Sequence, residues 1–132
     1  MKIVTAVIGI LINDRNDVLI ALRPPHVTYP GVWEFPGGKI EQDETPETAL
    51  IRELKEEIGI DVKTCEFFLK TIHDTAKKQT TLHAYKILKF HGSPYGAETQ
   101  EIRWVPINTL KNYEFPKANA SVIRALELAV YF

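Results

Sequence analysis

The sequence of 132 residues has a single cysteine, Cys65, and almost no net charge, −1 at pH 7. One cysteine excludes an intrachain disulfide and fits a reducing compartment, so we expect a cytoplasmic protein in which Cys65 is a small core residue. A nearly neutral chain lacks the basic surface on which non-specific binding of a nucleic-acid polymer depends. A small anionic ligand needs only a few local cations and is compatible with this charge.

Long apolar runs are also missing. The apolar run at residues 3–12 is too short to span a bilayer, so we expect no membrane partner. It is rich in β-branched residues and is followed by the turn-like NDRND and a second apolar stretch at 18–23. This pattern predicts two paired strands. Without repeats, low-complexity segments or linkers, the chain should form one domain over residues 1–132.

The chain contains strand-like runs arranged around one well-marked helix. Thr45 is a favoured N-cap, Pro46 suits the first helical position, and Gly59 suits the left-handed position after the last turn. A Gly-Gly turn is expected at 37–38. Further strands are predicted at 33–35, 63–74, 80–90 and 101–107, and a second helix at 120–132. This order predicts an α+β fold, an α/β/α sandwich around a mixed sheet.

The predicted first helix gathers acidic side chains beside its apolar stripe. The stripe that should face the core holds Leu50, Leu54 and Ile58, and the neighbouring arc holds Glu53, Glu56 and Glu57. Like charges four residues apart cost an isolated helix a few tenths of a kcal/mol. A solvated acidic face is one interpretation. The other is a site for a hard divalent cation, with Arg52 pairing with Glu56 one turn later.

The stretch from Gly38 to Ile60 resembles the Nudix hydrolase signature and matches it at every defined position. Gly38 is followed after five residues by Glu44, and after seven more by Arg52-Glu53-Leu54, Lys55, Glu56-Glu57, Ile58 and Gly59-Ile60. Three flanking segments resemble the MutT branch of that family: WEFPGGKIE at 33–41, YGAETQE at 95–101 and FPKAN at 115–119.

The resemblance implies a site for Mg²⁺ or Mn²⁺. The implied ligands are Glu53, Glu56 and Glu57, a backbone carbonyl of Gly37 or Gly38, and the further glutamate Glu98. Either Glu53 or Glu98 would accept the proton of the attacking water. Arg52 would orient Glu56 and Glu53, and Glu44 would hold the preceding loop against the helix.

The resemblance also implies a substrate, a nucleoside triphosphate attacked at the β-phosphorus to give a nucleoside monophosphate and pyrophosphate. Oxidised dGTP is the favoured substrate, and CTP-type pyrimidine triphosphates are the alternative. A non-catalytic nucleotide-binding module is a third reading, but such modules are expected to lose carboxylates that are all present here. A monomer is expected.

Several residues outside the helix are expected to contact the substrate. Arg23 and Lys39 flank the expected cleft and would meet phosphates. The approach to the signature supplies Glu34, Phe35, Pro36 and Gly37, and a Pro-rich loop supplies His26 and Tyr29. Asn119 has two candidate roles. It precedes the last helix as a favoured N-cap, and in the MutT branch the matching segment reads the base.

Overall fold

The computed structural model describes residues 1–24 and 31–129, and His26 and Tyr29 lie outside these described residues. The strands of the described part are β1 (Lys2–Ile10), β2 (Asp17–Leu22), β3 (Trp33–Glu34), β4 (Gly37–Lys39), β5 (Asp61–Asp74), β6 (Lys78–His91) and β7 (Ile102–Pro106). The helices are α1 (Pro46–Ile58) and α2 (Ala120–Ala129), with 3-10 turns at Ile107–Asn112 and Lys117–Asn119.

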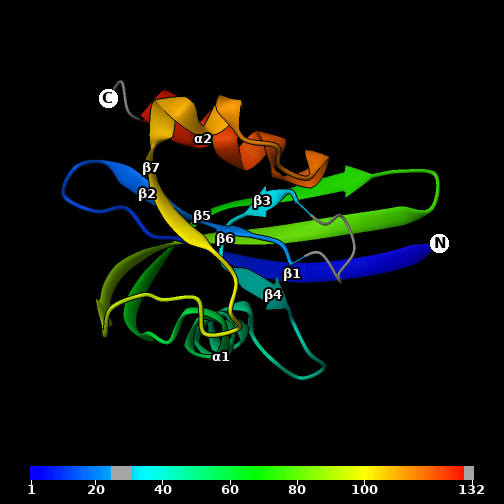
Figure 1. The fold of residues 1–132 in the computed structure, drawn as a ribbon. Coiled ribbons are helices and arrows are strands. Elements are labelled where there is room, and N and C mark those ends of the chain that lie inside the picture. Colours follow the sequence, from blue (N-terminus) through cyan, green and yellow to red (C-terminus); the bar gives the residue numbers. More distant parts are fainter. Residues whose placement is uncertain (25–30, 130–132) are drawn as a thin grey trace.

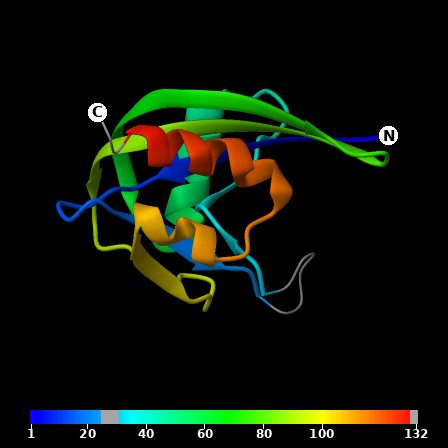
Figure 2. The ribbon, with the colours of Figure 1, turned by 90° about the horizontal axis from the view of Figure 1, so that it is seen from above.

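A mixed four-stranded sheet forms the middle layer, in the order β4-β1-β6-β5. Strands β1 and β6 run parallel, and the other two pairs are antiparallel. Helix α1 lies on one side of this sheet and α2 on the other (Figure 1). The predicted α/β/α sandwich is therefore confirmed. Seen from above, the long β5–β6 hairpin passes beside α2 and extends towards the N terminus (Figure 2).

A second sheet was not predicted. It has three antiparallel strands in the order β3-β2-β7. The expected pairing of residues 3–12 with 18–23 is wrong, because β1 is already bordered on its two sides by β4 and β6. The two segments meet only where the chain crosses between the sheets, through the bridge of Ile12 with Val18 and the bond from the Leu19 N–H to the Leu11 carbonyl at 3.1 Å.

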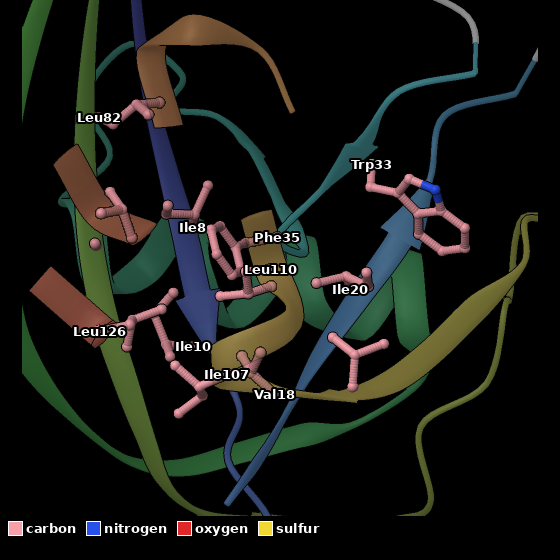
Figure 3. Packing of buried hydrophobic residues seen from close by; sticks show 13 residues of the cluster. Ile8, Ile10, Val18, Ile20, Trp33, Phe35, Leu82, Ile107, Leu110 and Leu126 are labelled. Carbon is pink, nitrogen blue, oxygen red and sulfur yellow. The ribbon is translucent and has the colours of Figure 1, made fainter. Parts of the chain in front are cut away.

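Two apolar clusters hold the layers together. One packs α2 against both sheets, and Figure 3 shows Phe35, Leu110 and Leu126 among its members. The other packs α1 against the opposite face of the mixed sheet, where Leu50, Leu54 and Ile58 are each 0% exposed. The predicted core-facing stripe of the helix is thus confirmed.

The ends of α1 follow from local chemistry. The Thr45 hydroxyl accepts a hydrogen bond from the Thr48 N–H at 3.1 Å, and Pro46 occupies the first turn. Gly59 adopts a left-handed conformation at φ 69° and donates its N–H to the Lys55 carbonyl at 3.1 Å. These contacts satisfy backbone groups that a helix end otherwise leaves unpaired. The predicted helix boundaries are confirmed.

Gly37 and Gly38 do not form the expected turn. They belong to β4, in which Gly37 pairs with Ile8 and Gly38 with Val7. A Cβ on Gly37 would collide with the Val7 carbonyl oxygen, and a Cβ on Gly38 with the Glu53 carboxylate. Gly37 is therefore needed because β4 lies against the backbone of β1, whereas a side chain at position 38 would displace the Glu53 carboxylate.

No helix within the described residues is long and apolar enough to cross a bilayer.

Candidate active site

The Glu57 carboxylate is the buried centre of the acidic group on α1. The residue is only 6% exposed, and its Oε2 accepts a hydrogen bond from the Gly37 N–H at 3.0 Å. The pKa of Glu57 is raised to about 8, mainly by burial and also by the negative charges of Glu34, Glu98 and Glu53, against the lowering effect of the Gly37 N–H. Four carboxylates from three separate segments therefore share one electrostatic environment.

Glu53 lies one turn before Glu57 and is partly exposed. Its Oε1 accepts a hydrogen bond from Arg52 at 2.8 Å. Burial raises the pKa of Glu53, Arg52 lowers it, and the charges of Glu56 and Glu98 raise it. Glu56 is mostly exposed, with a side chain 57% accessible. The structure thus brings Glu53, Glu57 and Glu98 together, with Glu56 at the solvent side.

Arg52 forms the predicted ion pairs with Glu53 and Glu56, but its main partner is a third carboxylate that the sequence did not suggest. Its guanidinium binds Glu44 with two hydrogen bonds of 2.8 Å, whereas its distance to Glu56 is 3.6 Å. The paired Arg52 lowers the pKa of Glu44 to about 2. Glu44 also accepts from the Glu41 N–H at 2.8 Å, and Arg52 donates to the Lys39 carbonyl at 3.2 Å. Arg52 therefore joins the loop before α1 to the helix. The same guanidinium also contacts Glu53 on the helix.

Arg23 and Glu34 form an ion pair at the edge of the site. The Arg23 Nη1 lies 2.8 Å from the Glu34 Oε2. Burial raises the pKa of Glu34, Arg23 lowers it, and the charge of Glu98 raises it. The sequence suggested Glu34 as a substrate contact. It did not show that the Glu34 carboxylate lies close enough to Glu57 to raise the pKa of Glu57. Its position in WEFPGG, just before the signature, was the available signal.

A loop after β6 carries Glu98 to the C-terminal end of α1. The Ala97 N–H donates to the Glu57 carbonyl at 3.1 Å, and the Gln100 side chain donates to the same carbonyl at 2.8 Å. The Gln100 Oε1 accepts from the Glu98 N–H at 2.9 Å. Gln100 was missed in the sequence because no local pattern predicts a side-chain contact across 43 positions.

The donor chemistry fits a hard divalent cation, although no metal cage is already formed among the residues that the structure describes. Carboxylates are the oxygen ligands that Mg²⁺ and Mn²⁺ accept, and this region holds those of Glu34, Glu53, Glu57 and Glu98, with Glu56 at its solvent side. The bare Cα of Gly38 leaves room beside the Glu53 carboxylate. The pKa values of Glu34, Glu53 and Glu57 are raised mainly by burial, and repulsion by neighbouring carboxylates adds to this; an added cation would oppose both effects.

A cavity of about 400 Å³ lies on the α2 side of the mixed sheet. Its walls come from β5, β6 and the segment before α2, and they include Val32, His73, Lys78, Thr80, Phe115, Pro116 and Ala118. The Phe35 and Phe115 rings contact each other, with centroids 5.2 Å apart. Of the other expected substrate contacts, Pro36 is buried and Lys39 is exposed on β4.

Asn119 directly follows this cavity wall and is 6% exposed. It is not the N-cap of α2, because it ends a 3-10 turn that runs straight into the helix. Its Nδ2 donates weakly to the Pro116 carbonyl at 3.5 Å. Its Oδ1 accepts no hydrogen bond within residues 1–24 and 31–129. That oxygen is nevertheless not one of the buried side-chain atoms left without a hydrogen-bond partner. The amide oxygen is therefore open to solvent or a ligand.

Known proteins are similar to this chain over most of its length. Residues 2–126 match the family profile of the NUDIX domain. The 8-oxo-dGTP diphosphatase of Escherichia coli strain K12 is 36% identical over 127 residues, covering 96% of this chain and 98% of that protein. The CTP pyrophosphohydrolase of the same strain is 33% identical over 125 residues, covering 95% and 92%. A solved structure from work on MutT of Aliivibrio salmonicida and Vibrio cholerae has a TM-score of 0.82 at 39% identity, covering 95% of this chain and 97% of that one.

The raised pKa of Glu57 predicts how the stability of the metal-free protein depends on pH. The native protein holds the Glu57 proton up to pH about 8, whereas a glutamate ordinarily loses it near 4.5. The stabilisation is complete below the lower value, so the free energy of unfolding should fall as pH rises between the two. Urea unfolding in excess chelator should show this fall, and Glu57→Gln should remove most of it.

Glu56→Gln is the matched control, because it removes one exposed carboxylate from the same turn and should keep the slope. An unchanged slope in Glu57→Gln would contradict the assignment of the buried proton to Glu57.

Proposed function

This chain belongs to the NUDIX family, and from that membership we propose that it hydrolyses 8-oxo-dGTP to 8-oxo-dGMP and pyrophosphate. It is a Nudix hydrolase whose relatives act on nucleotides. What we propose is the preferred nucleobase and the residues that bind the metal and carry out the reaction. The observation that carries it is the buried Glu57, which lies among three further carboxylates at the end of the Nudix helix. Nucleotide-pool sanitisation in the cytoplasm, by a monomer, would be the corresponding role.

Nudix hydrolases need a divalent metal, and we assign its ligands to Glu53, Glu56, Glu57 and Glu98, with a carbonyl of Gly37 or Gly38. When bound, Mg²⁺ neutralises developing charge on the phosphates and lowers the pKa of a bound water. The Gly37 N–H fixes the Glu57 carboxylate. Arg52 orients Glu53 through a contact of 2.8 Å while anchored on Glu44.

The reaction then needs one proton acceptor and one leaving group. The water oxygen bonds to the β-phosphorus, and the bond from that phosphorus to the bridging oxygen of the α-phosphate breaks. Glu53 or Glu98 accepts the water proton, and the nucleoside monophosphate leaves. Arg23, at the edge of the site, would bind phosphate oxygens by exchanging part of its pairing with Glu34. Lys39, which is exposed on β4, would add a second positive charge.

The register of the mixed sheet supports a nucleotide lying between the carboxylates and the cavity. Gly37 is level with Ile8 on β1, and Thr80 of the cavity wall is level with Val4. Four residues of extended strand separate these levels, which is about 13 Å. This is the separation along the strands only, and it suits a base in the cavity with phosphates that pass the β4 edge of the sheet to reach Glu57. Phe115, which lines the cavity, would pack beside the base, with the buried Phe35 ring behind it.

Asn119 would read the oxidised base. Unoxidised guanine presents the two acceptors N7 and O6 on one edge. Oxidation at C8 places a hydrogen on N7, so the open Oδ1 of Asn119 would accept from N7–H while its Nδ2 donates to O6. The Nδ2 is held only by the weak 3.5 Å contact with Pro116 and is available for that exchange. The second candidate is CTP, which the similarity to a CTP pyrophosphohydrolase favours.

Metal removal is the first test of this function. We expect pyrophosphate release from 8-oxo-dGTP in the presence of Mg²⁺, and no turnover in excess chelator, because the acidic group lacks enough protein counter-charge to bind a triphosphate alone. Re-adding Mg²⁺ should restore the rate. Turnover that persists in chelator would contradict the metal assignment.

Substrate ratios test the role of Asn119. Wild type should prefer 8-oxo-dGTP over dGTP, dATP and CTP, and Asn119→Ala should lose most of the preference over dGTP, because a buried unpaired acceptor no longer penalises the normal base. Because Asn119 does not cap α2, the midpoint of thermal unfolding should change little. Ala120→Ser, at an exposed neighbour, should leave the ratios unchanged.

Two results would contradict the base assignment. One is a lower stability of Asn119→Ala with unchanged substrate ratios, and the other is a wild type that prefers CTP.

A further inference from the structure

The loop that carries Glu98 is attached to the C-terminal end of α1 through the side chain of Gln100. This side chain has two ends, and each is used. Its Nε2 donates to the Glu57 carbonyl at 2.8 Å, and its Oε1 accepts from the Glu98 N–H at 2.9 Å. Gln100 therefore joins the backbones of two glutamates that come from distant parts of the chain.

Capping of the helix does not by itself require Gln100. The carbonyls at a helix end need donors, but the Ala97 N–H already donates to the Glu57 carbonyl at 3.1 Å and the Tyr95 N–H to the Ile58 carbonyl at 3.1 Å. Removal of the Gln100 side chain would leave both carbonyls with a backbone partner. What would be lost is the only contact that ties the backbone of Glu98 itself to α1 among the hydrogen bonds of the described residues.

The rest of the loop is shaped to bring Gln100 to this position. The Thr99 N–H donates to the Gly96 carbonyl at 3.0 Å, and Thr99 has a left-handed backbone at φ 65°. A Cβ on Gly96 would collide with the Gln100 carbonyl oxygen, so the chain folds tightly back on itself. The side chain of Glu98 is nevertheless exposed, and its direction depends on how this turn is held.

We propose that Gln100 is a positioning residue that sets the place of the Glu98 carboxylate relative to Glu57, and hence the affinity of the metal site. This inference rests on the proposed function, in which both glutamates are metal ligands. Gln100 touches neither substrate nor metal and acts only through Glu98. A ligand displaced by about 1 Å can cost on the order of 100-fold in rate, so the expected effects are large for a residue outside the chemistry.

A double-mutant cycle with Glu98 tests the proposal. Gln100→Ala should weaken Mn²⁺ binding and lower kcat about 10- to 100-fold with little change in KM and in the midpoint of urea unfolding. In the Glu98→Gln background the same Gln100→Ala change should have almost no effect on either quantity, because Glu98 is the group through which Gln100 acts. Ser93→Ala, an exposed polar residue of the same loop, should match wild type.

Gln100→Glu separates the two ends of the side chain. It keeps an acceptor for the Glu98 N–H but loses the donor to the Glu57 carbonyl, so it should behave like Gln100→Ala. Equal losses of Mn²⁺ affinity from Gln100→Ala with and without Glu98, or no loss at all, would overturn the proposal. Mn²⁺ binding, followed from the signal of the free ion in electron paramagnetic resonance, needs no substrate. If wild type bound Mn²⁺ but hydrolysed no nucleotide, the proposed function would fail while the cycle still decided the role of Gln100.

Discussion

The burial of the Glu57 carboxylate beside other carboxylates is the constraint on which the rest of the site depends. Removing a carboxylate from water disfavours its charged form, and neighbouring negative charges disfavour it further. The fold provides one hydrogen bond to this oxygen, from the Gly37 N–H. That bond requires β4 to run close to α1, and Gly37 also lets β4 lie against the backbone of β1. The backbone that positions the carboxylate is thus the same backbone that forms the sheet edge.

The arginines near the site form ion pairs with other carboxylates and not with Glu57. Arg52 is occupied by Glu44 and Glu53, and Arg23 is paired with Glu34. Glu57 has no ion pair with a protein cation within the described residues. Replacing such a buried, unpaired carboxylate by an apolar residue would be expected to increase the stability of the fold. Here the repulsion is kept, which is what the proposed binding of a divalent cation would relieve.

The parts of the structure set by local chemistry could be predicted from the sequence. Thr45, Pro46 and Gly59 give the limits of α1, and the spacing of Leu50, Leu54 and Ile58 gives its buried face. Contacts between distant segments could not be predicted. The partition of the strands into two sheets, the ion pair of Arg52 with Glu44 and the Gln100 bridge all depend on how the layers pack.

The wrong predictions at Gly37–Gly38 and at Asn119 have the same cause: the local sequence pattern is compatible with more than one structure. Two glycines usually mark a turn, but Gly37 and Gly38 serve a close approach of backbone and side chain instead. An asparagine before a helix usually caps it, but Asn119 lies in a 3-10 turn that continues into α2. In both cases the residue departs from its common structural role next to the site. The departure itself is a useful indication of function.

Proton release on metal binding tests the central claim most directly. If Glu57 holds a proton near neutral pH and must lose it to bind a cation, then Mn²⁺ binding at pH 7 should release about one proton per protein. Calorimetric titration in buffers of different ionisation enthalpy measures this number. We expect the release in wild type and its loss in Glu57→Gln. Binding of Mn²⁺ to wild type without release of a proton would contradict the account.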